Sequence, residues 1–240
     1  MNVEVVDAPL LPRRAATHIA TLLRDAAERR GRATLAVSGG STPAAMLAEL
    51  AELPVPWHAV HLFQVDERIA PDSDSARNLG QLEHSLLERL PAGARLAGFH
   101  PMPAAAARAG EGAAVAAATA YALALTRIAG DPAVLDAVHL GIGDDGHTAS
   151  LVPGDPALDI ADRDVAVTQL YRGHRRLTLT FPALARARAR MWLVSGAAKA
   201  EVVRRLVMGD RSIPAGRLPH SSSTLFADAA AASALPDLST

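Results

Sequence analysis

The feature that most constrains the fold of this chain is a regular alternation of short, β-rich apolar runs with longer segments of helical periodicity. We expect strands at residues 3–6, 34–37, 60–65, 137–142, 164–168, 176–181, 191–195 and 225–227, the last of them as an edge strand. We expect helices at residues 15–30, 43–53, 79–90, 104–125 and 199–207. This alternation predicts an α/β fold with a mostly parallel sheet, and the two runs between 164 and 181 lie close enough together to pair antiparallel. No repeat or linker divides the chain, so we expect one domain spanning residues 1–240.

Charge and composition exclude several classes of protein. The chain has 24 basic and 25 acidic side chains and a net charge of −1, which gives no electrostatic basis for a nucleic-acid or membrane partner. It has no cysteine, which excludes disulfides, thiolate nucleophiles and cysteine-ligated metals and is consistent with a reducing compartment. The first residues do not have the pattern of a signal peptide, and the alanine-rich stretch at 104–125 carries Arg108 and Glu111, which favour a helix of a soluble protein. We therefore expect a cytoplasmic protein.

Polar segments follow four of the expected strands at the point where each strand ends. They are SGGSTP at 38–43, DER at 66–68, GDDGH at 143–147 and SGAAK at 195–199. The carboxyl ends of parallel strands lie at one edge of a sheet, where ligands bind in open α/β folds. We therefore expect these four segments to form one site.

The segment at 38–43 has the composition of a phosphate-binding loop. Gly39 and Gly40 allow the backbone to approach a ligand closely, and a helix begins directly after them, so that its N–H groups and positive dipole end face outward. Ser41 and Thr42 add hydroxyl donors, and either one suits the cap of this helix. The spacing of a nucleotide-binding P-loop is missing, which disfavours a nucleoside triphosphate. The alternative interpretation is a glycine-rich turn and a helix cap with no ligand.

His147 is the candidate general base, because an imidazole titrates near neutral pH and can take a proton from water. Gly146 allows a sharp turn that projects the ring into a cleft, and either Asp145 or Asp66 can orient the imidazole. The alternative is a histidine in a surface turn without a chemical role. Asp144, Asp145 and His147 offer three ligands to a metal ion, but no histidine pair or second His/Asp cluster supports such a site, so we expect no metal.

Four cations are candidates for binding an anionic substrate: Arg68, Arg77, Arg176 and Lys199. Lys199 is the only lysine among 24 basic residues, and it follows a strand-to-helix turn where a compact point charge suits a phosphate. The alternative for Lys199 is a position on a helix surface with no role in binding.

Four blocks of sequence carry a resemblance to a known family: LAVSGGSTP at 35–43, VDER at 65–68, LGIGDDGHTASLVPG at 140–154 and RLTLTFPAL at 176–184. SGAAKA at 195–200 is a weaker fifth block. In order and spacing, these blocks resemble the glucosamine-6-phosphate isomerase/6-phosphogluconolactonase family over roughly residues 35–199. The resemblance implies a Rossmann-like three-layer αβα fold with a mostly parallel sheet.

The residues after His147 resemble the lactonase branch of that family. The deaminase branch typically continues its Asp-Gly-His with Ile-Ala-Phe-Asn-Glu-Pro, whereas this chain has Thr-Ala-Ser-Leu-Val-Pro at 148–153. The resemblance implies hydrolysis of 6-phosphogluconolactone, a small sugar-phosphate lactone, without a cofactor. The phosphate is expected on residues 38–42 with Arg176 and Lys199, and His147 is expected to activate water. Lactonases commonly have Ser-Asn where this chain has Arg77 and Asn78, so Arg77 either adds a phosphate contact or points to solvent.

Three other functions compete with this interpretation. An isomerase or deaminase of an amino-sugar phosphate shares the fold and the phosphate site. A non-catalytic sugar-phosphate sensor is disfavoured, because the chain has no basic helix–turn–helix segment. A dinucleotide-dependent oxidoreductase is disfavoured, because the segment at 38–41 lacks the Gly-x-Gly-x-x-Gly spacing.

Overall fold

A parallel sheet forms the centre of the computed structural model, which describes residues 1–236 except for the side chain of Ser41. Within those residues the sheet has seven strands, and every neighbouring pair is parallel. Their order across the sheet is β1 (Asn2–Val5), β10 (Ser223–Ala227), β9 (Ala189–Val194), β6 (Ala137–Leu140), β2 (Ala33–Val37), β3 (Val60–Gln64) and β5 (Gly98–His100).

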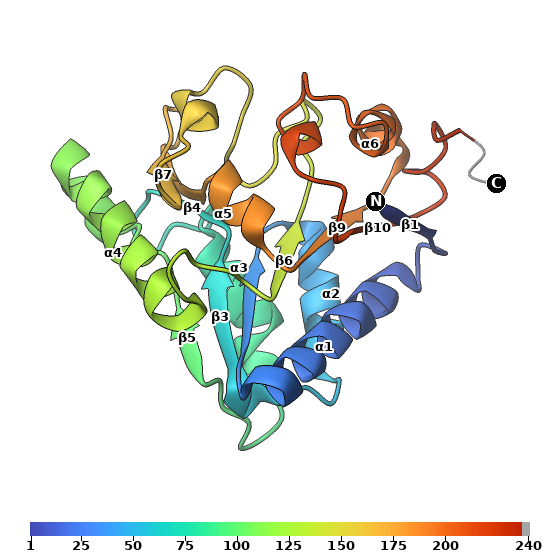
Figure 1. Ribbon diagram of the computed structural model, residues 1–240, viewed down its shortest axis with the longest axis horizontal. Coiled ribbons are helices and arrows are strands. Elements are labelled where there is room, and N and C mark those ends of the chain that lie inside the picture. The colour runs from blue at the N-terminus through green and yellow to red at the C-terminus, as the bar shows by residue number, and fades with distance from the viewer. Residues whose placement is uncertain (237–240) are drawn as a thin grey trace.

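Helices cover both faces of this sheet (Figure 1). The alternation of side chains along each strand explains why: Leu35 and Val37 belong to one apolar cluster, whereas Ala36 between them belongs to the other. One face packs against α1 (Leu11–Arg30), α2 (Ser41–Ala51) and α3 (Asn78–Ser85). The other packs against α4 (Glu111–Ala129), α5 (Phe181–Arg186) and α6 (Ala200–Val207). The expected three-layer αβα fold with a mostly parallel sheet is therefore confirmed.

A second, antiparallel sheet stands at the end of the first. It consists of β4 (Asp66–Arg68), β8 (Arg176–Leu179) and β7 (Val165–Val167), with β8 in the middle. The antiparallel pairing expected between the runs at 164–168 and 176–181 is present here. The segment at 66–68, expected as a loop, is instead a strand, because its backbone pairs with β8 directly after the chain leaves β3.

Several element boundaries differ from those expected. The run at 225–227 is not an edge strand, because β1 pairs with the outer side of β10 and itself becomes the edge. The run at 176–181 stops at Leu179, and α5 begins at Phe181 with a proline in its first turn. The alanine-rich helix begins only at Glu111, because Gly110 has a φ of 127° that breaks the preceding turn. Strand β5 was missed within a segment rich in glycine and proline.

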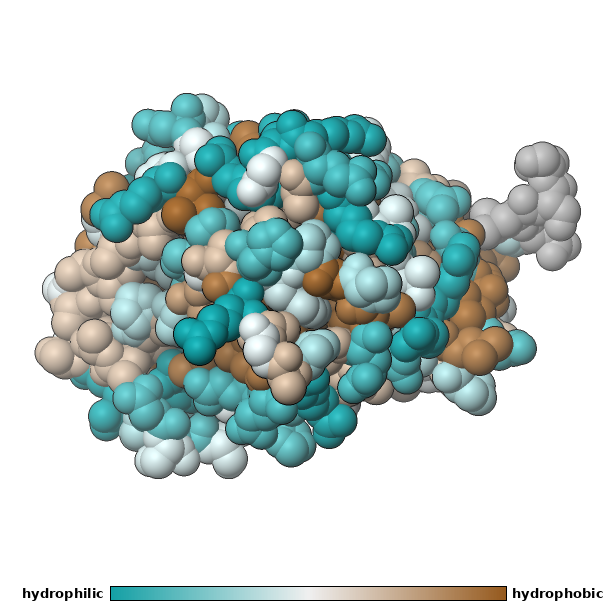
Figure 2. Space-filling view, turned by 90° about the horizontal axis from the view of Figure 1, so that it is seen from below, coloured by the Kyte–Doolittle hydropathy of each residue, from teal (hydrophilic) through white to brown (hydrophobic). Residues whose placement is uncertain are grey.

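Helix α4 is long and apolar enough to cross a membrane by length and composition, and it is the only such helix within residues 1–236. In the structure a row of its residues is buried in the core: Ala114, Ala117, Ala118, Tyr121 and Leu125. The pale brown, weakly apolar surface at the left of Figure 2 lies on the side where Figure 1 places α4. The helix therefore packs on the protein through one row, and its alanine-rich remainder faces outward.

His139, on β6, is a fully buried histidine. His139 is 1% exposed, and neither ring nitrogen has a hydrogen-bond partner among residues 1–236. It faces the same side of the sheet as Ala137, toward the cluster that contains its register partner Met191. Burial lowers the pKa of His139 to about 4. The imidazole is therefore neutral in the folded protein at neutral pH.

This burial predicts a pH-dependent loss of stability. The folded-state pKa of His139 lies below the ordinary value of 6.5, so the unfolded chain binds the proton more tightly. Stability is therefore full above about pH 6.5 and is lost as the pH falls toward 4, by up to about 3 kcal/mol. Urea unfolding at pH 7.5 and pH 5.0 measures this loss. His139→Leu should reduce it and should be at least as stable as the wild type at pH 7.5, because two unpaired buried nitrogens are removed.

Burial also lowers the pKa of His18, His61 and His100, so some pH dependence will remain in the variant. The test therefore compares wild type and His139→Leu in how much free energy of unfolding each loses between pH 7.5 and pH 5.0. An identical loss in both proteins would contradict the assignment to His139.

Candidate active site

A pocket opens at the carboxyl ends of the central strands, where the four polar segments meet. It is lined by Ser38, Gly39, Gly40, Asp66, Arg68, Asn78, Gly141, Ile142, Gly143, Asp144, His147, Ala149, Tyr171, Arg172, Arg176 and Lys199. The expected convergence of segments 38–43, 66–68, 143–147 and 195–199 on one site is thus present in the geometry. The loop between β7 and β8 adds a fifth wall that the strand pattern did not indicate.

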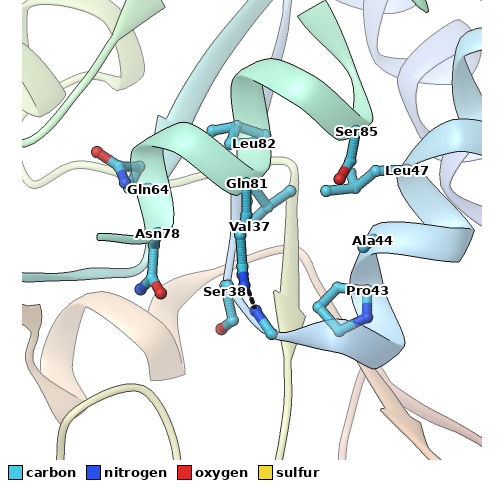
Figure 3. Close-up of a pocket in the computed structure, with 12 residues that line it drawn as sticks. Val37, Ser38, Pro43, Ala44, Leu47, Gln64, Asn78, Gln81, Leu82 and Ser85 are labelled. Carbon is cyan, nitrogen blue, oxygen red and sulfur yellow. Dashed lines mark hydrogen bonds between the residues drawn. The ribbon is translucent and has the colours of Figure 1, made fainter. Parts of the chain in front are cut away.

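The glycine-rich loop after β2 lies against the start of α3. A Cβ atom on Gly39 would overlap the side chain of Asn78, so only glycine fits at this position. The backbone N–H of Gly40 donates to Gln81 Oε1 over 2.9 Å (Figure 3). Gly40 is also the N-cap of α2, so the expected cap at Ser41 or Thr42 is wrong; the helix starts at residue 41, two residues before the expected start at 43.

Two of the expected phosphate-binding residues of this loop line the pocket, and one does not. Gly39 and Gly40 are part of the wall, whereas Thr42 is not, because it lies in the first turn of α2. The side chain of Ser41 lies outside what the structure describes. The contact between Gly40 and Gln81 means that this N–H already has an acceptor on the protein.

His147 and Asp145 form a hydrogen-bonded pair at the pocket wall. His147 Nδ1 lies 2.6 Å from Asp145 Oδ1, and the His147 backbone N–H donates to the same oxygen over 3.1 Å. A carboxylate can only accept, so Nδ1 carries the proton and Nε2 is left with a lone pair. A Cβ atom on Gly143 would overlap the imidazole, and therefore a glycine is needed for the ring to lie here.

Asp145 remains ionised in this setting. Partial burial favours its neutral form, but the hydrogen bonds from His147 and from Tyr171 outweigh it and hold the pKa of Asp145 below its ordinary value. The Tyr171 hydroxyl donates to Asp145 Oδ2 over 2.9 Å. Each carboxylate oxygen thus has a partner, and the plane of the group is fixed.

Asp66, the other candidate for orienting the imidazole, makes a different contact. Its Oδ2 accepts a hydrogen bond from the Ser150 hydroxyl over 2.6 Å. Burial raises the pKa of Asp66, while Ser150 and the nearby charge of Arg176 oppose the rise. The geometry therefore separates the two aspartates: Asp145 contacts His147, and Asp66 lies beside the cations.

Three of the four expected cations line the pocket, together with Arg172. Arg176 is 6% exposed, and burial lowers the pKa of its guanidinium, with the charge of Asp66 opposing. Lys199 Nζ donates to the Ile142 carbonyl over 2.9 Å and to Asp144 Oδ1 over 2.5 Å. Arg68 donates to Asn78 Oδ1 over 2.9 Å and to the Ala76 carbonyl. Within residues 1–236, the guanidinium groups of Arg172 and Arg176 make no hydrogen bond and no ion pair, so these are the pocket cations least engaged by the protein.

Arg77 is the exception. Its side chain is 3% exposed, and its Nε lies 3.6 Å from Glu67 Oε2 while Nη1 pairs with Asp72. It does not line the pocket, and it does not point to solvent, so the solvent alternative for Arg77 is wrong, while the phosphate contact stays a prediction. The buried carboxylate of Glu67 lies beside the guanidinium and holds it within the protein.

Sequence reasoning missed Tyr171, Arg172 and Asn78 as pocket residues. Tyr171 and Arg172 lie in a loop between two short strands, in the segment YRGHRR at 171–176, which does not directly follow the end of an expected strand of the parallel sheet. Asn78 directly follows Arg77, and a single asparagine beside a cation does not by itself indicate a binding site. Within residues 1–236, no group of three or more His, Asp or Glu side chains is arranged to hold a metal ion.

Comparison with known proteins places the chain in a family. The model for glucosamine-6-phosphate isomerases/6-phosphogluconolactonase matches residues 7–226. A 6-phosphogluconolactonase of Mycobacterium tuberculosis is 37% identical over 239 residues, which covers 96% of each chain. One of Synechocystis sp. is 36% identical over 195 residues, which covers 81% of this chain and 80% of that relative.

Solved structures agree with the sequence comparison. The 6-phosphogluconolactonase of Trypanosoma brucei superposes with a TM-score of 0.82 at 25% identity, covering 98% of both chains. A monomeric glucosamine-6-phosphate deaminase superposes with a TM-score of 0.80 over 98% of this chain and all of that one, but at 20% identity it shows the common fold alone. The chain therefore belongs to the glucosamine-6-phosphate isomerase/6-phosphogluconolactonase family.

Proposed function

We propose that this protein hydrolyses 6-phosphogluconolactone to 6-phosphogluconate in the cytoplasm, the lactone-opening step of the pentose phosphate pathway. The observation that carries the proposal is a histidine–aspartate pair placed in a pocket whose other wall is cationic. The lactonase names of relatives that are 36–37% identical over most of the chain support it.

In this proposal the phosphate anchors the substrate. Arg176 supplies a guanidinium that no carboxylate of residues 1–236 pairs with at 4.0 Å or less, and Lys199 adds a second charge at the same wall. Gly39 and Gly40 allow the sugar phosphate to approach the backbone of the loop. Binding at this remote group holds the lactone ring in one orientation relative to His147, which lowers the entropic part of the barrier.

His147 is then the general base. Its Nε2 takes a proton from a water molecule while Asp145 accepts the hydrogen bond from Nδ1 and stabilises the imidazolium that forms. The hydroxide adds to the C1 carbonyl, and backbone N–H groups of a glycine turn, or an arginine other than the one on the phosphate, stabilise the negative charge on the carbonyl oxygen. When the C1–ring-oxygen bond breaks, His147 returns the proton to the ring oxygen. One water is consumed, a hydroxyl and a carboxylic acid are formed, and the acid releases its proton to solvent as the carboxylate.

The deaminase of the same family is the second candidate. Residues 148–153 follow the lactonase pattern rather than the deaminase one, so no glutamate assists the histidine in that stretch. Ammonia release from glucosamine 6-phosphate, measured with the same preparation, distinguishes the two activities.

One prediction concerns His147, the proposed general base. His147→Ala should lower kcat by roughly 10²–10⁴-fold with little change in KM, because proton transfer is lost and the phosphate anchor is kept. The measurement is a coupled assay. Glucose-6-phosphate dehydrogenase supplies fresh lactone, 6-phosphogluconate dehydrogenase reports its opening, and spontaneous hydrolysis is subtracted. His84→Ala, an exposed histidine paired only with Glu88, is the matched control and should behave as wild type. Full turnover by His147→Ala would remove the histidine from the mechanism.

The second prediction concerns the phosphate. Arg176→Gln should raise KM for 6-phosphogluconolactone about tenfold or more, and should change KM for unphosphorylated gluconolactone much less, because one charged contact to the phosphate is lost. Arg163→Gln is the matched control, since Arg163 pairs with Asp162 on the exposed surface. An equal rise for both lactones would contradict a phosphate contact at Arg176.

A further inference from the structure

The loop between β7 and β8 ends in a tight turn that points a cation into the pocket. Tyr171 and His174 exchange two backbone hydrogen bonds, of 3.0 and 3.2 Å, across the two-residue turn Arg172 and Gly173. Both central residues have positive φ, 47° for Arg172 and 84° for Gly173, as a type I′ turn requires. Arginine is an unusual residue for this backbone conformation, and its presence at the turn is a reason to look for a function of its side chain.

Tyr171 begins this turn and contacts two separate parts of the pocket. Its hydroxyl donates to Asp145 Oδ2 over 2.9 Å, on the opposite carboxylate oxygen from the one that accepts His147 Nδ1. Its ring lies edge-on to the His147 imidazole, with 5.7 Å between the ring centroids. Partial burial and the bond to Asp145 raise the pKa of the Tyr171 phenol, so the hydroxyl stays protonated and remains a donor.

Two guanidinium groups lie near the aromatic ring of Tyr171. The guanidinium carbon of Arg172 lies 5.2 Å from the ring centroid, and that of Arg176 lies 5.0 Å from it. Both distances are within the range of cation–π attraction. Two like charges near one ring repel each other, and the attraction of each guanidinium to the electron-rich ring offsets part of that repulsion.

We propose that Tyr171 is a positioning residue with two separable parts: its hydroxyl holds Asp145 against His147, and its ring holds Arg172 and Arg176 as a pair of cations that receives the substrate phosphate. The proposal rests on the proposed lactonase function and extends it to residues outside the blocks on which the family resemblance was founded. It also assigns Arg172, rather than Arg77, as the additional cation of the phosphate site.

A purely structural role for Tyr171 fits the observations less well. The ring is only partly buried and belongs to neither apolar cluster of the core. The other tyrosine of the chain, Tyr121, shows what a structural tyrosine is like here: it is 2% exposed, lies in the core, and bonds the backbone of Gln64. The side chain of Tyr171 instead contacts Asp145 and three residues that line the pocket, His147, Arg172 and Arg176.

Two substitutions separate the two parts. Tyr171→Phe removes the hydroxyl and keeps the ring, so kcat should fall about three- to tenfold while KM stays within twofold of wild type. Tyr171→Leu removes both, so kcat should fall at least as far and KM for 6-phosphogluconolactone should rise about tenfold. Arg172→Gln should raise KM by a similar factor with kcat nearly unchanged, and it tests the cation pair even if the leucine variant does not fold.

Tyr121→Phe is the matched control, because it makes the same chemical change at a tyrosine outside the pocket. It should lower the melting temperature and leave kcat and KM within twofold of wild type. A wild-type kcat in Tyr171→Phe would overturn the role of the hydroxyl. A KM in Arg172→Gln equal to that of wild type would overturn the role of the cation pair.

Binding of 6-phosphogluconate, measured by calorimetry, keeps this proposal distinct from the proposed function. Wild type without lactonase activity would refute the proposed function. Weaker binding of 6-phosphogluconate by Tyr171→Leu and Arg172→Gln, but not by Tyr171→Phe, would still support the proposal that the ring positions the two cations of an anion site. Equal affinity for 6-phosphogluconate in wild type and all three variants would overturn the role of the ring and of Arg172 in anion binding, regardless of the kcat values.

Discussion

A buried carboxylate at the junction of β4 and α3 fixes the wall on which the substrate phosphate is proposed to lie. Glu67 is fully buried and accepts hydrogen bonds of 2.8 Å from the backbone N–H groups of Arg68, Asn78 and Leu79, and one of 2.9 Å from Gln64 Nε2. Two of these donors are the first N–H groups of α3, where a negative charge is favoured. The charge is thereby distributed over four partners, and the residues that line the pocket beside it have little freedom to move.

Burial of that charge has a cost that the ion pair with Arg77 helps to offset. The same pairing removes Arg77 from the pocket, which leaves anion binding to cations whose positions are set in other ways. Lys199 is held by a carbonyl and by Asp144, and Arg172 and Arg176 are held by an aromatic ring. The cations are therefore positioned before a substrate arrives, so that little of the binding energy of the proposed phosphate contact is spent on ordering their side chains.

The features that the sequence predicted well depend on local rules. Strands and helices follow hydrophobic periodicity, and the convergence of polar segments follows from parallel strands ending at one edge. The errors concern contacts between distant residues. Whether Asp145 or Asp66 reaches His147 depends on the turn around Gly143 and on Ser150, which occupies Asp66. The position of the Arg77 side chain depends on Glu67, ten residues earlier in the chain, and hydrophobic periodicity does not predict that these two side chains pair.

The position of the last strand has a consequence for how the molecule is made. Strand β10, near the end of the chain, lies between β9 and β1, so the first four-residue strand has no partner until residues 223–227 have been synthesised. Strand β1 precedes every other strand of the sheet in the sequence and is thus among the last to be paired. Between the synthesis of β9 (Ala189–Val194) and that of β10, the edge of the sheet at β9 stays open, and exposed strand edges of this kind are where unfinished chains associate with one another.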